Sequence, residues 1–519
     1  MTITDHPAFL DSYDLASIRL GGSVLLASDD FFAEKENLLL PHPAVWKEHE
    51  YTDRGKWMDG WESRRKRTPG HTSGPGTPWN DWAIIRLGVP GILRGAVVDT
   101  SFFRGNYPES CSIEGTAAPI DAHPDVLLAE ETEWVEALPR VSLQGNFKNL
   151  FEIVCPYAFT HVRLRIFPDG GVARLRLHGD VVPDWPRRGH ARGEIDLAAA
   201  EHGGDVLIAS DMFFGERRNL VMPGRAKNMS DGWETRRRRG PGSDWAIVRL
   251  GATGTISRLE IDTNHFKGNF PDLCQIEACL ASGATTEELV ASSAWKTLLP
   301  KVKLQAHTRH FFEGELAELG PVSHVRINVY PDGGVSRLRV YGTLDDDARL
   351  GLGVRRLDTL TPRLAKAALR SACASTRWTQ GMLSARPFGS VDALLAAAKR
   401  VWDTTGPDDW KEAFLAHPRI GEQRATTDRG AEERSWSRRE QSGMAAASPE
   451  LTAEMADVNK RYEARFGFTY IVCASGKTAT ELLDIAKGRL DNPPDKELEV
   501  ASQELLAIAL LRLKKLVTP

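Results

Sequence analysis

The most constraining feature of this 519-residue sequence is a pair of motifs that each occur twice. DGWESRR at Asp59–Arg65 returns as DGWETRR at Asp231–Arg237, and DWAIIRLG from Asp81 returns as DWAIVRLG from Asp244. A chain with a long internal repeat folds as two similar units, so the repeat has to be recognised before any single element is assigned.

The spacing between the two copies shows where they differ. The offset is 182 at Ser28 (210 − 28), 172 at Asp59 (231 − 59) and 163 from Asp81 onward (244 − 81). The first copy therefore has extra residues around 41–54 and 71–77, whose polar, Pro- and Gly-rich composition predicts surface loops. A repeat of this length indicates a duplicated domain and not a solenoid.

Alternation of apolar and polar residues predicts short strands in both copies. Val172–His178 and Val335–Tyr341 alternate with period two, and each follows a Pro-Asp-Gly-Gly turn. Ala246–Leu250 and Leu259–Asp262 also fit strands, whereas residues 1–20 are expected to lead into the first domain. Many short strands separated by such turns favour a sandwich or jelly roll.

The pattern changes after the second copy. Residues 344–361 contain three consecutive Asp and two nearby Gly, which predicts an exposed linker. Beyond it apolar residues recur with helical spacing, from Leu364 to the amphipathic stretch Ala501–Leu516. The predicted protein is multidomain, with two β-sandwich (jelly-roll, galactose-binding-like) repeats at 1–185 and 186–343, a linker at 344–361 and an all-α helical bundle at 362–519.

Composition limits the kinds of molecule that the protein is expected to bind and the compartment in which it is expected to work. The 66 Lys and Arg nearly balance the 70 Asp and Glu, so no basic field favours nucleic acid or an anionic membrane surface. Six scattered cysteines form no CxxC pair, which favours a reducing compartment and argues against structural zinc. No apolar run approaches the roughly 20 residues of a membrane-spanning helix, and no secretory signal is visible. We expect a soluble, cytoplasmic protein.

The repeated heptapeptide has two interpretations that stay open. Trp61 and Trp233 are either core residues or part of a site, since aromatic side chains mostly pack in cores and interfaces. The Arg pair that begins at Arg64 either pairs with neighbouring Glu62, as its counterpart would with Glu234, or forms a planar fork for a substrate carboxylate.

The order SDDFF, MDGWESRR, DWAIIRLG and DTSFFRGNYP, kept in both copies with small changes, resembles allantoicase over residues 14–343. The resemblance implies two similar β-sandwich repeats that hydrolyse allantoate to (S)-ureidoglycolate and urea. It assigns no catalytic residue, and dependence on a divalent metal is left open. The site lies in one repeat, in both, or between them. The candidates are the polar positions shared with the family: Asp29, Asn37, Asp59, Glu62, Arg64, Asp99, Asn106 and His161, with Asp211, Asn219, Asp231, Glu234, Arg236, Asp262, Asn269 and His324.

A binding module is the alternative from another class. Jelly rolls commonly bind sugars or other small molecules without chemistry. Such a module needs no set of Asp, Glu and His, and it is usually exported. A titration with simple sugars separates the two hypotheses.

The helical part carries its own polar motifs. A histidine before a proline at a helix end, as at His417, is either a cap or a catalyst. Ser437, Glu440 and Gln441 at i, i+3 and i+4 share one helix face and could surround a small polar ligand. Arg512 lies among leucines, where a cation needs an anionic partner, and the turn at Ser475 offers backbone N–H groups.

The motifs HPRIGE and SRREQSGM, in that order, resemble the decarboxylase of 2-oxo-4-hydroxy-4-carboxy-5-ureidoimidazoline (OHCU) over residues 358–517. The resemblance implies decarboxylation of OHCU to (S)-allantoin without metal or cofactor. Carried over by position, it implies catalytic roles for His417 and Glu440 and substrate binding by Pro418, Ser437, Gln441, Ser475 and Arg512.

Together the resemblances predict a bifunctional enzyme of urate and allantoin breakdown, with small-molecule substrates, allantoate and OHCU, and a homo-oligomeric state. Another enzyme opens allantoin to allantoate between the two steps. The alternative is that only one half is active and that the other is a scaffold.

Overall fold

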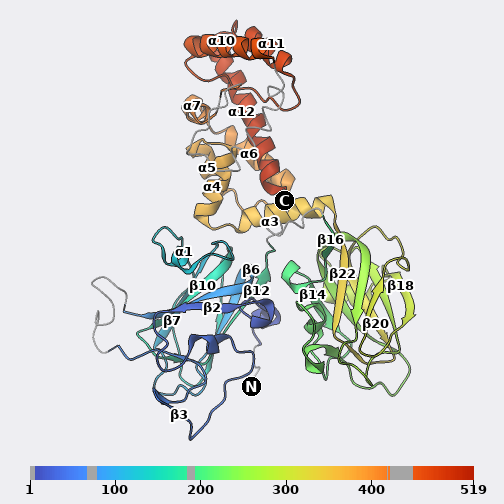
Figure 1. The fold of residues 1–519 in the computed structure, drawn as a ribbon. Coiled ribbons are helices and arrows are strands. Elements are labelled where there is room, and N and C mark those ends of the chain that lie inside the picture. The colour runs from blue at the N-terminus through green and yellow to red at the C-terminus, as the bar shows by residue number, and fades with distance from the viewer. Residues whose placement is uncertain (1–5, 67–78, 184–192, 418, 421–447, 519) are drawn as a thin grey trace. The chain divides into compact units, whose positions relative to one another are not determined.

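The computed structural model describes residues 6–66, 79–183, 193–417, 419–420 and 448–518 (Figure 1). The chain divides into two compact units, Met1–Arg349 and Leu350–Pro519. The first unit contains both repeats, and the second contains helices. Among the described helices, none is long and apolar enough to cross a membrane.

The first repeat is built around one 19-residue strand, β6. Its first half lies between β2 and β10, and its second half lies between β9 and β12, always antiparallel. One strand thus takes part in both halves of the sandwich. The elements are η1 (Ala8–Asp11), β1 (Tyr13–Asp14), η2 (Ile18–Leu20), β2 (Ser23–Ala27), η3 (Lys35–Leu39), β3 (Tyr51–Thr52), β4 (Gly55–Lys56), β5 (Trp61–Glu62), β6 (Asp81–Asp99), β7 (Ser110–Thr116), α1 (Pro124–Leu128), β8 (Val135–Ser142), β9 (Lys148–Glu152), β10 (Ala158–Phe167), β11 (Gly171–Val172) and β12 (Arg174–Val181).

The second repeat has the same strand order around an equally long β16. The two expected strands Ala246–Leu250 and Leu259–Asp262 are therefore parts of a single strand, which continues through the glycines between them. Its elements are β13 (Ile195–Asp196), η5 (Ala200–His202), β14 (Asp205–Ala209), η6 (Arg217–Val221), η7 (Met229–Asp231), β15 (Trp233–Glu234), β16 (Asp244–Asp262), β17 (Leu273–Cys279), α2 (Thr286–Ala291), β18 (Lys296–Lys303), β19 (Arg309–Phe312), β20 (Pro321–Tyr330), β21 (Gly334–Val335) and β22 (Arg337–Leu344).

Both period-two stretches form strands, as predicted, and burial alternates in β12, whereas every position of β22 up to Val340 is buried. In β12, Leu175 and Leu177 are fully buried, whereas Arg176 between them and His178 after them are half-buried. The two repeats are thus antiparallel β-sandwiches, as predicted from this alternation. Residues 13–14, expected to belong to a leader, form strand β1 and pair with β12.

The first repeat has two predicted loop insertions, and the structure describes one of them. Those around 41–54 include a small hairpin of β3 and β4, in which Tyr51 pairs with Lys56. The second predicted loop, 71–77, lies outside the described residues.

The second unit is a helical bundle, as predicted. Its core contains the fully buried Trp378, Tyr462 and Leu505, contributed by three different helices. The helices are α3 (Asp346–Thr359), α4 (Pro362–Ala372), α5 (Thr376–Ser384), α6 (Val391–Trp402), α7 (Pro407–Leu415), α10 (Pro449–Phe466), α11 (Ala479–Arg489) and α12 (Pro494–Val517).

The stretch 344–361, expected to be an exposed linker between domains, is helical and partly buried. It contains helix α3, whose Val354 and Leu357 are buried. Gly353, which suggested a flexible linker, lies against the last turn of α12: a Cβ atom there would be 1.8 Å from the Val517 carbonyl oxygen. The glycine therefore permits close packing of two segments and does not mark flexibility.

The buried face of α4 also differs from the expected one. Leu364 is 39% exposed, whereas Ala365, Leu369 and Ala372 are buried. A short helix with apolar residues at several adjacent positions leaves its inward face ambiguous by one residue, and packing against α5 and α12 decides it.

Candidate active sites

The exposed arginine of each heptapeptide forms an ion pair with the aspartate that follows the second strand. Arg64 Nε lies 2.6 Å from Asp29 Oδ2, and Arg236 Nε lies 2.8 Å from Asp211 Oδ2. The interpretation in which Arg64 pairs with Glu62 is therefore replaced by a pairing with Asp29. Both guanidinium groups are more than half exposed, so they are accessible to an anion.

The tryptophans of the heptapeptides belong to the core. Trp61 and Trp233 are fully buried. Each indole Nε1 donates a 2.8 Å hydrogen bond to a main-chain carbonyl, that of Asp29 in the first repeat and that of Asp211 in the second. Each Trp thus fixes the loop that carries the ion-paired aspartate.

A glutamate next to each Trp binds an asparagine from a distant loop. Asn106 Nδ2 donates to Glu62 Oε1 at 2.7 Å, and Asn269 donates to Glu234 at 2.5 Å. Burial raises the pKa of Glu62, although the hydrogen bond from Asn106 opposes this effect. Glu62 is therefore held by an amide, in a half-buried position.

An aspartate–arginine pair lies at the end of each sandwich, buried in the first repeat and partly buried in the second. One guanidinium nitrogen of Arg174 lies 2.9 Å from both carboxylate oxygens of Asp59, and Arg337 lies 3.1 Å from Asp231. Neither arginine was predicted as a site residue, because in the alternating pattern both occupy outward positions of strands. Their signal was the repeat itself, since an arginine occurs at the same place after each Pro-Asp-Gly-Gly turn.

The aspartates that end the long strands lie opposite these arginines in strand register. Asp99 is the register partner of Arg174, and Asp262 that of Arg337. In each, Oδ1 accepts a 2.8 Å hydrogen bond from the amide two residues on, for example from Ser101 to Asp99. The strand register thus places the Asp that ends the long strand opposite the arginine that binds the Asp of DGW in each repeat.

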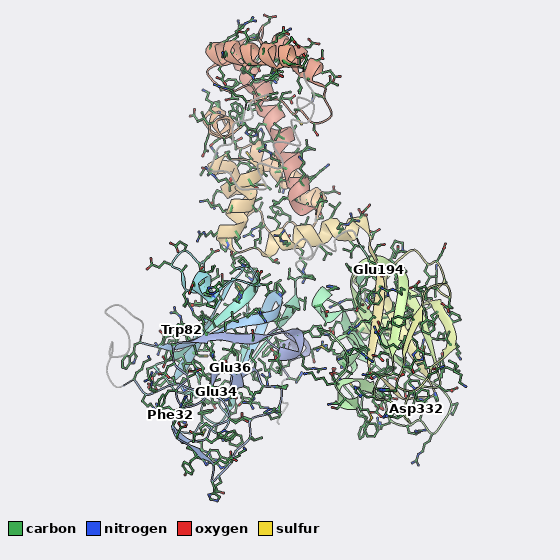
Figure 2. All side chains as sticks on the ribbon, viewed as in Figure 1. Phe32, Glu34, Glu36, Trp82, Glu194 and Asp332 are labelled. Atoms are coloured by element: carbon green, nitrogen blue, oxygen red, sulfur yellow. The ribbon has the colours of Figure 1, made fainter. Side chains whose placement is uncertain are left out.

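The shared asparagines have a structural contact in each repeat. Asn37 Nδ2 donates to the Gly60 carbonyl at 3.0 Å, and Asn219 Nδ2 donates to the Gly232 carbonyl at 2.9 Å. They hold the glycine that lies between the Asp and the Trp of each heptapeptide. All these groups flank the short pairings β5–β11 and β15–β21; Figure 2 labels Asp332 in the turn before β21, at the end of the second sandwich opposite Glu194.

The two candidate histidines lie elsewhere. His161 pairs in register with Arg86 and Thr116, six residues before the end of β10, which is about 20 Å at 3.3 Å per residue. His161 and His324 are buried in the strands and are not brought together with the groups above. Burial, assisted by Arg86 beside His161, lowers the pKa of each imidazole to about 4.

A divalent metal for the repeats was left open by the sequence. Among the described residues, no group of three or more His, Cys, Asp or Glu side chains is placed to hold a metal ion.

In the helical unit, His417 lies just beyond the end of α7. Its ring Nδ1 is 3.1 Å from the Ala413 carbonyl oxygen. A carbonyl only accepts, so Nδ1 donates, and in the neutral ring the lone pair is on Nε2. Arg419, two residues on, forms a two-point ion pair with Glu463 of α10 at 2.7 and 2.6 Å, which anchors the segment after His417.

The turn at Ser475 follows a buried segment that is anchored by charge. Arg489 lies 2.5 Å from Glu497 and donates to the Ile471 carbonyl at 2.8 Å. This buried network joins α11, α12 and the segment before Ser475, whose side chain is exposed. Gly476 has a positive φ of 79°, which allows the sharp turn there.

Arg512 lies on α12, half-buried, close to Cys373 at the end of α4. Burial raises the pKa of the Cys373 thiol to about 12, and the Arg512 charge opposes that effect. The remaining predicted decarboxylase residues, Pro418, Ser437, Glu440 and Gln441, lie outside the described residues.

Comparison with known proteins identifies both halves. The allantoicase repeat profile matches residues 13–182 and 195–345. The chain belongs to the allantoicase family. The profile of OHCU decarboxylase matches residues 358–514, so this allantoicase chain also carries a domain of a second enzyme family.

Whole relatives of the allantoicase part are similar along nearly their full length. A probable allantoicase of Burkholderia mallei is 51% identical over 342 residues, which are 65% of this chain and 97% of that protein. A probable allantoicase of Stutzerimonas stutzeri is 50% identical over 330 residues, 63% of this chain and 95% of that protein. The crystal structure of allantoicase from Saccharomyces cerevisiae is 34% identical, with a TM-score of 0.52, and covers 66% of this chain and 98% of that one.

Proposed function

We propose that the protein is a bifunctional enzyme of purine breakdown. Its repeats hydrolyse allantoate to (S)-ureidoglycolate and urea, and its helical unit decarboxylates OHCU to (S)-allantoin. The observation that carries the proposal is the coverage of the two family profiles, which match 13–345, apart from a short gap, and 358–514 of one chain. The cytoplasmic location and the homo-oligomeric state stay predictions.

The chemistry of allantoate fits the groups at the sandwich ends. Allantoate carries one carboxylate and two neutral ureido groups on a central carbon. Hydrolysis breaks the bond from that carbon to one ureido nitrogen; the water oxygen joins the carbon, and the nitrogen leaves with a proton as urea. Guanidinium groups bind the carboxylate with two parallel hydrogen bonds, and carboxylates accept from ureido N–H groups.

The chemistry of OHCU fits a histidine without a cofactor. Loss of carbon dioxide leaves an electron pair that delocalises into the adjoining C=N–C=O system of the ring. The neighbouring carbon, which bears the ureido group, then takes a proton on one face, and the 4-hydroxyl gives up its proton to become the new carbonyl of allantoin. His417, with Nδ1–H bound to the Ala413 carbonyl, presents Nε2 for proton transfer at the 4-hydroxyl.

His417 tests the decarboxylase half. We expect His417→Asn, which keeps a hydrogen-bond donor but cannot titrate, to lower OHCU turnover at least the hundredfold typical of a positioned acid or base. The readout is optically active allantoin formed from freshly generated OHCU, because spontaneous decay gives the racemate. Allantoate hydrolysis by the same sample is the control and should be unchanged. Wild-type rate and chirality in the variant would contradict a proton-transfer role.

Allantoate hydrolysis by the unaltered chain tests the other half. The expected result is formation of one urea per allantoate, with optically active ureidoglycolate as the second product. A chain that binds sugars and releases no urea from allantoate would favour a binding module in the repeats instead.

A further inference from the structure

The two repeats use the same backbone but different side chains at one corner of the sandwich end. Phe102 and His265 occupy equivalent positions (102 + 163 = 265) with φ of 69° and 71°. The backbone N–H of Phe102 donates to Asn146 Oδ1, and that of His265 donates to His307 Nδ1, each at 2.8 Å. The first repeat thus has Phe and Asn where the second has two histidines.

In the first repeat an aromatic side chain covers this corner. Trp46, from the extra segment, stacks on Phe102 with ring centroids 6.0 Å apart and an interplanar angle of 28°. Lys56 of the adjacent hairpin lies 4.8 Å from the Trp46 ring. The backbone of Val45 donates to Asp59 at 2.9 Å, so the segment is fixed in place. A ligand at this corner of the first repeat would therefore contact mainly apolar carbon atoms.

In the second repeat the same corner is open and charged. Arg225 stands where the first repeat has Pro43, and its side chain is 59% exposed. Its Nε lies 3.7 Å from Asp262 Oδ2, although Asp262 is only 1% exposed. Oδ2 of Asp262 makes no hydrogen bond to any described residue. The Arg225 guanidinium is thus the charged partner of this buried carboxylate oxygen.

The two imidazoles offer complementary groups. His265 Nε2 lies 3.0 Å from the Ala226 carbonyl oxygen and therefore donates, which leaves the lone pair of the neutral ring on Nδ1. His307 Nδ1 accepts from the His265 amide, so its Nε2 carries the proton in the neutral ring. The ring centroids are 5.7 Å apart. One ring thus presents an acceptor and the other a donor.

Asp231, the aspartate of the heptapeptide in the second repeat, already forms ion pairs with two arginines. Asp231 binds Arg337 at 3.1 Å and Arg19, contributed by the first repeat, at 2.5 Å. Burial alone would raise the pKa of Asp231, but the Lys227 amide and the two guanidinium groups lower it. The position equivalent to Arg19 is Glu201 (19 + 182 = 201), so this cross-contact has no mirror image. Asp231 therefore stays a carboxylate that holds arginines, and the accessible groups are those in which the repeats differ.

We propose that allantoate binds at this corner of the second repeat and that the first repeat has no such site. The inference rests on the proposed hydrolysis of allantoate. Arg225, with Asp262 behind it as its ion-pair partner, takes the carboxylate, and His265 and His307 take a ureido carbonyl and a ureido N–H. The first repeat supplies Arg19, which holds Asp231 and Arg337 in place.

The test exchanges the histidines for the side chains of the first repeat. His265→Phe with His307→Asn restores a pair that Phe102 and Asn146 already hold in the same backbone conformation, so folding should be retained. We expect kcat/KM for allantoate to fall at least a hundredfold, with OHCU turnover unchanged. The matched control is the reverse exchange in the first repeat, which should leave allantoate hydrolysis unchanged.

A second variant guards against loss of folding. Arg225→Ala removes an exposed side chain, and we expect KM for allantoate to rise about tenfold or more at an unchanged melting temperature. A wild-type kcat/KM in the double histidine variant, or an unchanged KM in Arg225→Ala, overturns the inference while the proposed function stands. No hydrolysis of allantoate by the unaltered chain refutes the proposed function itself.

Discussion

The two strand histidines should make the repeats less stable at mildly acidic pH. His161 and His324 are buried, and burial with a neighbouring arginine lowers the pKa of each to about 4, from 6.5. A base with a lower pKa in the folded chain binds fewer protons there than in the unfolded chain. Its contribution to stability is therefore complete above pH 6.5 and is lost as the pH falls toward 4.

The size of the effect follows from these values. A fall in pKa from 6.5 to about 4 corresponds to roughly 3.4 kcal/mol per histidine once both states have titrated. At pH 5 the imidazole is protonated in the unfolded chain and neutral in the folded one. About 2 kcal/mol per repeat is then lost between pH 7 and pH 5. This is a large share of the stability of an ordinary domain.

The assay must separate the repeats within the full chain. Native-state hydrogen exchange, read on peptides from β10 and β20, gives a free energy of opening for each repeat. His161→Gln removes the titrating ring and keeps a polar atom for Thr160 Oγ1, which lies 2.9 Å from His161 Nδ1. We expect the β10 opening energy of this variant to fall about 2 kcal/mol less than that of the wild type between pH 7 and pH 5. In His324→Gln we expect the same smaller loss of opening energy in β20 and none of this change in β10.

Two results would refute this reasoning. An equal loss of β10 stability in wild type and His161→Gln would mean that other groups titrate there. Position along β10 separates His161 from the groups at the sandwich end. If a folded His161→Gln variant lost allantoate hydrolysis at pH 8, that histidine would nevertheless belong to the active site.

Two further perturbations test the packing. Arg174→Ala leaves the 5%-exposed Asp59 without its guanidinium partner, so the first repeat should lose about 3–5 kcal/mol, measured by hydrogen exchange; a loss below about 1 kcal/mol would show the pair to be dispensable. Gly353→Ala places a methyl group against the Val517 carbonyl and should lower the melting temperature of the helical unit, whereas Gly351→Ala, with open space around it, should leave it unchanged or raise it; equal effects would contradict the close packing of α3 on α12.

Much of the fold could be predicted from local patterns. Alternation in Val172–His178 and Val335–Tyr341 identified strands, because a half-buried strand exposes every second side chain. The internal repeat predicted two similar domains, and the helical period after residue 362 predicted a bundle. These features depend on residues close together in sequence, so a single sequence is enough to reveal them.

The candidate site could be predicted only in part. The repeated motifs predicted Asp59, Glu62 and Asn106 as site residues, and the structure places all three at one sandwich end. They also predicted His161, which belongs to the same repeat but lies in the middle of a strand. A motif shared by two copies identifies positions that the fold needs as well as positions that a ligand needs, and sequence alone does not separate them.

Only the tertiary structure decided which charged groups meet. Asp59 and Arg174 are 115 residues apart, and Arg19 reaches Asp231 across 212 residues. Such partners are set by how the strands close into a sandwich, and no local periodicity records that closure. The same holds for Gly353. Its sequence context suggests a flexible segment, whereas in the structure the end of α12 packs against it. A contact between distant segments depends on the three-dimensional path of the whole chain, and so does the difference between the aromatic cover of the first repeat and the open, charged corner of the second.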